Sequence, residues 1–206
     1  MQTRLAKPEP EFSEAFGLVA GQTSSGRGGV YRWCEQACDE GDGHVSGSVL
    51  FDFHDLLIVH LDADVAGKKY RDHNIDDAVN DLPCEQPCPP CTDTTNALRK
   101  VLLRWMGEPS TPSRCVLCTP SKNTETWVMA AFFPSDPVMK KKGWECYETP
   151  AARLAVQPLK QRIKKSVSDY RQRSNDLKQA WPQICALTEA ARFEKEFVLE
   201  LASLEP

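Results

Sequence analysis

The stretch "LLIVHLDADVAG" (residues 56–67) decides the predicted fold, because a strongly apolar run ends in two acidic residues. Residues 56–59 are aliphatic or β-branched, a pattern that favours a buried strand. Asp62 and Asp64 follow at alternate positions, so both carboxylates point to the same side if the strand continues. Two carboxylates held this close disfavour each other's ionised form unless a cation compensates them. The pattern predicts a divalent metal site, with an ordinary turn closed by Gly67 as the alternative.

A second apolar segment, "RCVLCTP" (114–120), also reads as a strand. Like residues 56–61 it lacks strict alternation, which predicts burial on both faces. Between the two lies "TTNALRKVLLRWMG" (94–107), an amphipathic helix that ends at Gly107. Strands that alternate with helices predict an α/β fold with a mainly parallel sheet flanked by helices. Ligands bind at the carboxyl ends of such strands, so the acidic pair and the loop after the second strand are expected to converge.

That loop, "TPSKNTETW" (119–127), offers two more candidate residues, Lys122 and Glu125. In the functional interpretation Lys122 contacts a phosphate and Glu125 joins the two aspartates around a metal ion. In the alternative, Lys122 is a solvated lysine and Glu125 only complements the dipole of the helix that it opens.

The composition limits the class of protein. The chain has 206 residues, 41% of them hydrophobic, and a formal net charge of −4. This length suits one globular domain with a helical extension, or two small domains. No apolar run approaches the roughly 20 residues of a membrane span, and residues 1–12 lack the apolar core of a signal peptide. We therefore expect a cytoplasmic protein that does not contact the membrane.

Nine cysteines are an unusually high and odd number. Without an export signal, a disulfide framework is not expected. The stretch "CEQPCPPC" carries Cys84, Cys88 and Cys91, and its second half has the C-x-x-C spacing of a zinc knuckle or redox pair. Cys115 and Cys118 repeat that spacing, but residues three apart on a strand face opposite ways. The cysteines are thus either ligands of a structural Zn²⁺ or buried thiols.

Periodicity and composition assign the other segments. Short strands are predicted at 15–21 ("AFGLVAG") and 143–149 ("GWECYET"), and helices at 29–40 and 123–133. Residues 21–29 ("GQTSSGRGG") read as a flexible loop in which Arg27 is a candidate phosphate contact. Residues 68–93 form a polar insertion rich in cysteine and proline, and residues 151–206 a helical extension.

Two stretches of the sequence, 139–144 and 160–173, are rich in basic residues, although the net charge of the chain is negative. They are solvated surfaces by default, and contacts to nucleic acid or an acidic partner protein are the alternative. The candidate residues are Lys140, Lys141, Lys142, Lys164 and Lys165.

Taken together, "LLIVHLDADVAG", a following helix and "CVLCTPSKNTETWVMAAFFP" resemble the TOPRIM-like (topoisomerase–primase) proteins found among bacterial antiphage-defence components. Residues 15–134 carry the resemblance, within a predicted domain of residues 1–150. It implies a compact TOPRIM/Rossmann-like α/β domain that binds Mg²⁺ or Mn²⁺ and cuts or joins phosphodiester bonds in DNA or RNA. Asp62 and Asp64 match the family's Asp-x-Asp motif, and Glu125 matches a later acidic residue more loosely. The family's catalytic Glu after a first apolar strand has no counterpart here, which puts nuclease activity in doubt.

Three functions follow from these observations. The first is a metal-dependent nuclease-like subunit that uses Asp62, Asp64, Glu125 and Lys122 inside a complex with a larger partner, such as an ATPase. The second is a non-catalytic adaptor of such a complex, which the charged C-terminal helices and the acidic insertion suit. The third is a glycosyltransferase, whose Asp-x-Asp motif also ends an apolar strand and holds a metal-bound nucleotide sugar.

Overall fold

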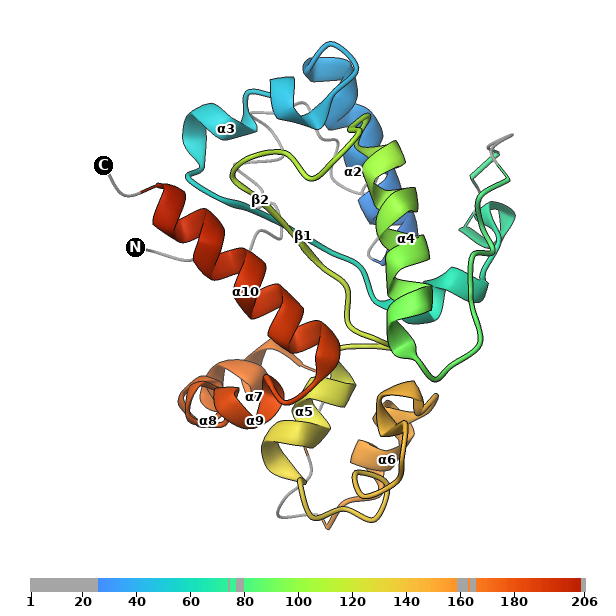
Figure 1. Ribbon diagram of the computed structural model, residues 1–206, viewed down its shortest axis with the longest axis vertical. Coiled ribbons are helices and arrows are strands. Elements are labelled where there is room, and N and C mark those ends of the chain that lie inside the picture. The colour runs from blue at the N-terminus through green and yellow to red at the C-terminus, as the bar shows by residue number, and fades with distance from the viewer. Residues whose placement is uncertain (1–25, 74, 77–79, 159–162, 164–165, 205–206) are drawn as a thin grey trace.

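A pair of short parallel strands lies at the centre of the protein (Figure 1). The computed structural model describes residues 26–73, 75–76, 80–158, 163 and 166–204. β1 (Leu57–His60) and β2 (Cys115–Cys118) pair in parallel, with Leu57 opposite Cys115 and His60 opposite Cys118. A mixed α/β fold with parallel strands is therefore confirmed, whereas within the described residues the sheet has two strands only.

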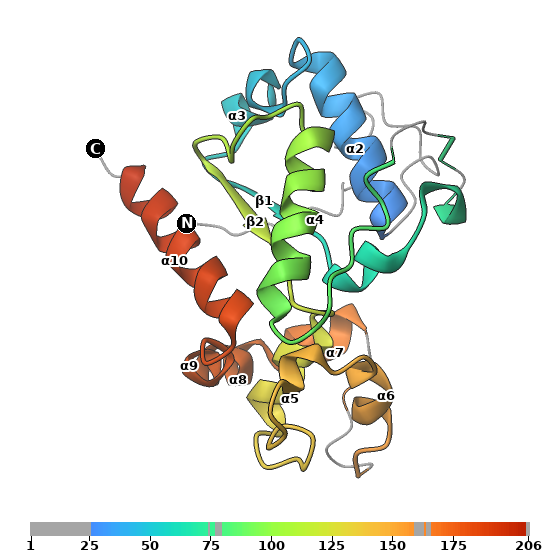
Figure 2. The same ribbon diagram turned by 45° about the vertical axis from the view of Figure 1, so that its right-hand side comes forward.

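Helices cover the strand pair from two sides (Figure 2). α2 (Arg27–Glu40) and α4 (Cys91–Trp105) pack together on one side, and α10 (Thr188–Ser203) packs against β2 on the other. The other helices are α3 (Leu50–Phe53), α5 (Glu125–Phe132), α6 (Pro150–Ala155), α7 (Val167–Gln172), α8 (Ser174–Gln179) and α9 (Trp181–Ile184). Single 3₁₀ turns are η1 (Val45–Gly47), η2 (Ala63–Gly67), η3 (Tyr70–His73) and η4 (Trp144–Cys146).

The two strands differ in burial. In β2, Leu117 belongs to the core shared with α4, and Cys118 packs with Ala190 of α10, so both faces are buried as predicted. In β1, Val59 faces the same core as Leu117, but Ile58 is 39% exposed. The prediction of burial on both faces is wrong for β1, because α10 packs mainly against β2 and leaves Ile58 exposed.

Other local predictions also have mixed outcomes. The helices expected at 94–107 and 123–133 are α4 and α5. The strand expected at 143–149 is wrong: Gly143 adopts a left-handed conformation (φ 73°) and starts the turn η4. Arg27, expected in a loop, is the first residue of α2. The strand expected at 15–21 lies outside the described residues.

The C-terminal helix α10 is fastened to the sheet and to α4 by charged groups. Arg99 of α4 donates to Glu196 at 2.8 and 2.7 Å and to the carbonyl of Leu117 at 2.8 Å. The N–H of Arg114, just before β2, donates to Glu200 at 2.8 Å. A domain boundary at 150/151 stays a prediction, but a helix beyond that point covers the central sheet.

The predicted insertion 68–93 is not confined to the surface. Tyr70 and Leu82 are buried in the core beneath α4. The indole N–H of Trp105 donates to the Tyr70 hydroxyl at 2.7 Å, and that hydroxyl donates to Asp81 at 2.6 Å. The insertion is thus anchored to the fold, and its position beside the strand ends is fixed.

Glu189, at the start of α10, allows a test of this packing. Its carboxylate is buried and accepts a 2.7 Å hydrogen bond from the Thr95 hydroxyl. Burial raises the pKa of Glu189 despite that bond and the charges of Arg192 and Arg99. The folded state therefore binds the proton more tightly than the unfolded state, and stability falls as the pH rises through the unfolded pKa and toward the raised one.

We expect Glu189→Gln to increase the free energy of unfolding at pH 7 by up to about 1 kcal/mol, because the amide keeps an acceptor without the buried charge. Urea unfolding of both proteins at pH 7 and pH 4 measures the effect, which should shrink at pH 4, where the carboxyl of the wild type is protonated in the folded state. A gain that is equal at both pH values would contradict this cause.

Candidate functional site

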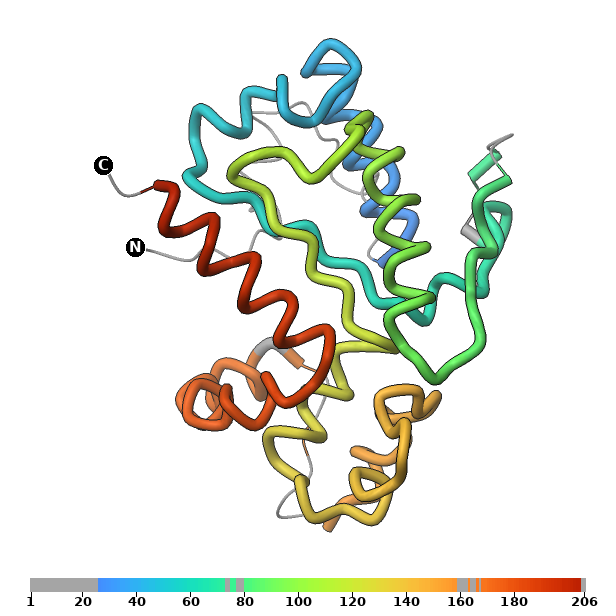
Figure 3. Tube along the Cα trace, viewed as in Figure 1, coloured from blue at the N-terminus to red at the C-terminus, as the bar shows by residue number. Residues whose placement is uncertain are grey.

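The loops that follow the two strands remain side by side beyond the sheet (Figure 3). The N–H groups of Leu61, Ala63 and Asp64 donate to the carbonyls of Cys118, Pro120 and Lys122 at 3.0, 3.1 and 2.8 Å. Residues 61–67 and 119–125 therefore form one edge, which we call the rim. The predicted convergence of the acidic turn with the loop after the second strand is confirmed.

Asp62 is held at the rim by residues of both loops. Its Oδ1 accepts hydrogen bonds from the N–H and the hydroxyl of Thr124, each at 3.0 Å, and lies 3.3 Å from His60 Nε2. Burial alone would raise the pKa of Asp62, but the hydrogen bonds and charge of His60 and the bonds from Thr124 together lower it. Asp62 is thus a fixed carboxylate that stays ionised at neutral pH, with 25% of its side chain exposed.

The other predicted acids are arranged differently from the expectation. β1 ends at His60, so Asp64 does not alternate with Asp62 on a strand but lies in the turn η2, where it is exposed. Glu125 is the first residue of α5 and is buried. Across the described residues, no group of three His, Cys, Asp or Glu side chains is arranged to hold a metal ion. The rim therefore carries two aspartates in one turn, and a ligand role for Glu125 stays a prediction.

Lys122 lies at the rim, beside a residue of the insertion. Its Nζ is 3.0 Å from Oε1 of Glu85, and its side chain is 12% exposed. The carbonyl of Lys122 accepts the hydrogen bond from Asp64, so the backbone fixes the position from which this side chain extends. Lys122 is thus a cation at the same edge as the two aspartates, as predicted, and it forms an ion pair in this arrangement.

Arg27 does not have the exposed position expected of a phosphate contact. It is 3% exposed, and its guanidinium donates to the carbonyls of Val65 and Lys69 at 3.3 and 2.8 Å. Burial lowers its pKa, although the charges of Asp72 and Asp64 oppose this shift. The prediction of a nucleic-acid contact by Arg27 is wrong for this arrangement, because the side chain instead holds the acidic turn in place from behind.

The predicted basic surface is described only in part. Lys140, Lys141 and Lys142 are exposed in the turns after α5, as expected of either a solvated surface or a nucleic-acid contact. Lys164 and Lys165 lie outside the described residues.

The cysteines form a disulfide rather than a zinc site. Cys88 is bonded to Cys146, with their Cα atoms 5.7 Å apart. The sequence did not predict this single bond, which excludes a Zn²⁺ site that uses Cys84, Cys88 and Cys91 together. Seven cysteines are free. Burial raises the pKa of Cys115 and Cys118 in β2 to about 12, so both behave as the buried thiols of the alternative interpretation.

Sequence reasoning missed three residues near the site. The side chain of His60 is 47% exposed, and its Nε2 lies 3.1 Å from the Thr124 hydroxyl. Thr124 contacts Asp62, and Glu85 contacts Lys122. The sequence did contain a signal for Thr124. It lies in the loop after the second predicted strand, the loop that was expected to meet the aspartates. Glu85 lies in a segment without periodicity, so no local pattern indicated its contact with Lys122.

Asp62 and Asp64 are the rim residues that could hold a hydrated divalent cation. Mg²⁺ usually keeps several waters and uses only one or two protein carboxylates together with substrate phosphate oxygens. An ionised, hydrogen-bonded Asp62 and an exposed Asp64 in one turn fit that donor set. A lysine at the same edge suits the phosphate that would complete it.

No protein-family model matches the chain, and no curated protein or solved structure matches it significantly. A search of the described helices found none that is both long and apolar enough to cross a membrane.

Proposed function

We propose that the protein is a TOPRIM-like, metal-dependent subunit that binds Mg²⁺ or Mn²⁺ at Asp62 and Asp64 and cleaves phosphodiester bonds of DNA or RNA. The observation that carries the proposal is the rim, where hydrogen bonds from Thr124 fix Asp62 beside the loop that bears Lys122. Two carboxylates at the carboxyl end of a parallel strand, with a cation from the next strand's loop, suit a phosphate-bound divalent metal.

In this proposal each residue has a separate role. Asp62 and Asp64 hold the cation, which supplies Lewis-acid polarisation of the phosphate and lowers the pKa of a bound water. Lys122 neutralises charge that develops on phosphate oxygens. Thr124 positions Asp62 through its two hydrogen bonds, and Arg27 positions the turn through the carbonyls of Val65 and Lys69.

A non-catalytic adaptor in the cytoplasm, docked on a larger partner such as an ATPase, is the second candidate. Its support is the pair Val198 and Leu199, which are adjacent in α10 and both more than half exposed. Exposed apolar residues of this size mark interaction sites when they form a patch. Under this candidate the rim binds a metal weakly or not at all, and cleavage is absent.

Plasmid nicking tests the first candidate directly. The purified chain should convert supercoiled plasmid to the nicked form in Mg²⁺ or Mn²⁺ but not in EDTA, since the cation supplies the Lewis acid. The Asp62→Asn/Asp64→Asn variant, purified identically, controls for a contaminating nuclease. Calorimetric titration of Mg²⁺ and Mn²⁺ into both proteins measures metal binding separately. Equal nicking by the double variant would refute the assignment, and metal binding without cleavage of DNA or RNA would favour the adaptor.

A further inference from the structure

The segment of residues 84–88, part of the insertion, lies directly on the acidic turn of the rim. The N–H groups of Cys84 and Glu85 both donate to the carbonyl of Ala66, at 2.7 and 3.2 Å. A Cβ atom built on Gly67 would lie 2.7 Å from Oε2 of Glu85, so this carboxylate rests against a residue without a side chain. Glu85 is therefore held within the turn that carries Asp64.

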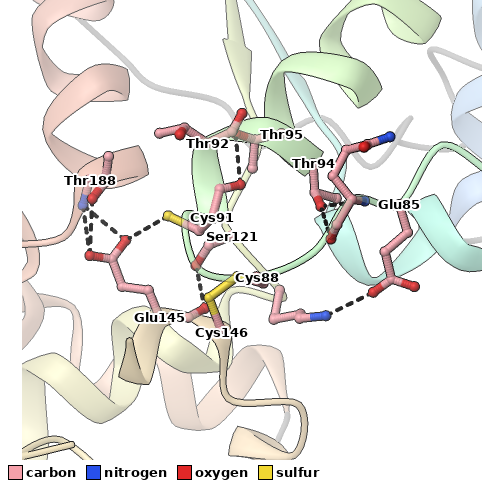
Figure 4. The surroundings of a disulfide bond; sticks show 12 residues. Glu85, Cys88, Cys91, Thr92, Thr94, Thr95, Ser121, Glu145, Cys146 and Thr188 are labelled. Carbon is pink, nitrogen blue, oxygen red and sulfur yellow. Dashed lines mark hydrogen bonds and ion pairs between the residues drawn. A yellow bond between two sulfur atoms is a disulfide. The ribbon is translucent and has the colours of Figure 1, made fainter. Parts of the chain in front are cut away.

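The same carboxylate forms the ion pair with Lys122. Its Oε1 lies 3.0 Å from Nζ of Lys122, and Figure 4 draws the Glu85 side chain in the surroundings of the Cys88–Cys146 disulfide. A phosphate that approached Lys122 would have to displace Glu85, and the carboxylate repels an incoming anion. Residues 84–88, which we call the acidic latch, thus cover the cation that the proposed function requires.

The disulfide fastens the far end of the acidic latch. Cys88 is bonded to Cys146 in the turn η4, and the neighbouring Glu145 carbonyl accepts a 2.9 Å hydrogen bond from the hydroxyl of Ser121, which belongs to the rim. Gln86, in the middle of the latch, exchanges hydrogen bonds with the Thr94 hydroxyl at 3.0 and 3.1 Å. The latch is therefore tied to the rim at one end and cross-linked beside it at the other (Figure 4).

The cysteine inventory favours a bond that can be broken. Two of the nine cysteines are paired, while seven are thiols. A structural framework would pair most of them, whereas the disulfides of proteins in reducing compartments are usually catalytic or redox-sensing. Cys91, three residues after Cys88, hydrogen-bonds to Glu145 at 3.3 Å. Burial and the Glu145 charge raise the pKa of Cys91 to about 12, which keeps it protonated and limits its attack on the disulfide.

We infer that the Cys88–Cys146 disulfide is a redox lock that holds Glu85 on Lys122, so that the oxidised protein binds phosphate groups at the rim weakly and the reduced protein binds them well. The importance of Lys122 rests on the proposed function. Opening requires a dithiol: its two S–H groups become one disulfide, while Cys88 and Cys146 each gain a hydrogen as thiols. Without the cross-link, residues 84–88 are held at the turn by the hydrogen bonds to Ala66 and Thr94 and by the Glu85–Lys122 ion pair, which break more readily than a covalent bond.

Chemical modification of Lys122 tests the lock without any nuclease readout. The full-length chain, oxidised or reduced with dithiothreitol, is treated with a limiting amine-reactive ester, and acylation is quantified by mass spectrometry against the exposed Lys195 of α10. Because the Glu85 side of this ion pair is 47% exposed, the pair is weak, and we expect reduction to increase relative Lys122 acylation by about fivefold. Glu85→Gln should give the same increase in both redox states, and Cys88→Ser/Cys146→Ser should mimic reduction. Cys185→Ser, which leaves the disulfide intact, is the matched control.

The outcomes separate this inference from the proposed function. If Lys122 acylation is the same in oxidised protein, reduced protein and Glu85→Gln, no latch exists. If Glu85→Gln raises acylation and reduction does not, the disulfide is not the lock and the inference is wrong. If acylation rises as expected but reduced protein still cleaves no DNA or RNA, the latch is supported and the nuclease proposal fails.

Discussion

Replacing Asp62 with asparagine should reduce metal-dependent cleavage at least about 100-fold, a loss typical of removing a metal or transition-state ligand. The amide retains an oxygen that can accept the hydrogen bonds from Thr124, so the loop should keep its position. What changes is the charge: the cation loses one of the two carboxylates in the turn. Asp39→Asn, an exposed substitution on α2, is the matched control and should cleave like the wild type.

The same substitution has a second, pH-dependent signature. The pKa of Asp62 is lowered in the folded protein, so its stabilising contribution is present above the unfolded pKa and is lost as the pH falls through the folded one. At pH 7 we expect Asp62→Asn to be about 1 kcal/mol less stable than the wild type, since charge-assisted hydrogen bonds to Thr124 become neutral ones.

Urea unfolding from pH 7 down to pH 2 should show that difference vanish at the acid end. A variant that loses activity without this change in stability would indicate that the carboxylate is not held as the structure shows. A variant that keeps its activity would remove Asp62 from the proposed site.

Replacing Arg27 with methionine should lower the free energy of unfolding by about 3 kcal/mol, the largest stability effect that we expect. Methionine fills a similar length but donates no hydrogen bond, so the carbonyls of Val65 and Lys69 lose the donors seen in the structure. Both hydrogen bonds are partly buried, although Val65 is half-buried and Lys69 exposed, and the loss of such a bond to a charged donor costs about 1.5–3 kcal/mol. For a chain of this size, the expected loss lowers the melting temperature by about 6–12 °C.

The size of this effect distinguishes two roles of Arg27. If Arg27 were an exposed phosphate contact, its replacement would weaken nucleic-acid binding and change the free energy of unfolding by less than about 0.5 kcal/mol. The same small change in stability is expected of Arg171→Met on the surface of α7. Thermal unfolding followed by circular dichroism, with Arg171→Met as the control, therefore decides the role. An Arg27→Met protein as stable as the wild type would show that the arginine does not hold the acidic turn.

The strands and the rim were predictable from sequence because their signals are local. An apolar run of four residues followed by Asp62 specifies a strand end, and its alternation with helices specifies parallel neighbours. Contacts between residues far apart in the sequence were not predictable in this way. Nothing near Arg27 reveals the two carbonyls about 40 residues away, and its glycine-rich surroundings read as a loop rather than a helix start. The burial of β1 was overestimated, because a short apolar strand has the same sequence pattern whether one face or both faces are buried.

The cysteines show the same limit more sharply. The C-x-x-C spacing of Cys88 and Cys91 suggested that these two would act together, yet the partner of Cys88 is 58 residues away. Connectivity cannot be deduced from spacing alone, because each arrangement of cysteines permits many pairings. The Glu85–Lys122 contact depends on that same distant placement and was invisible for the same reason.

The fastening of α10 onto β2 has a consequence for how the protein is made. Arg99 donates to Glu196, and the backbone N–H of Arg114 donates to Glu200, both close to the last residue that the structure describes. During synthesis, one face of β2 and the charge of Arg99 stay uncovered until Glu196 has left the ribosome. Contacts of such long sequence separation form slowly and leave apolar surface exposed in the meantime, so nascent chains of this protein should rely on chaperones.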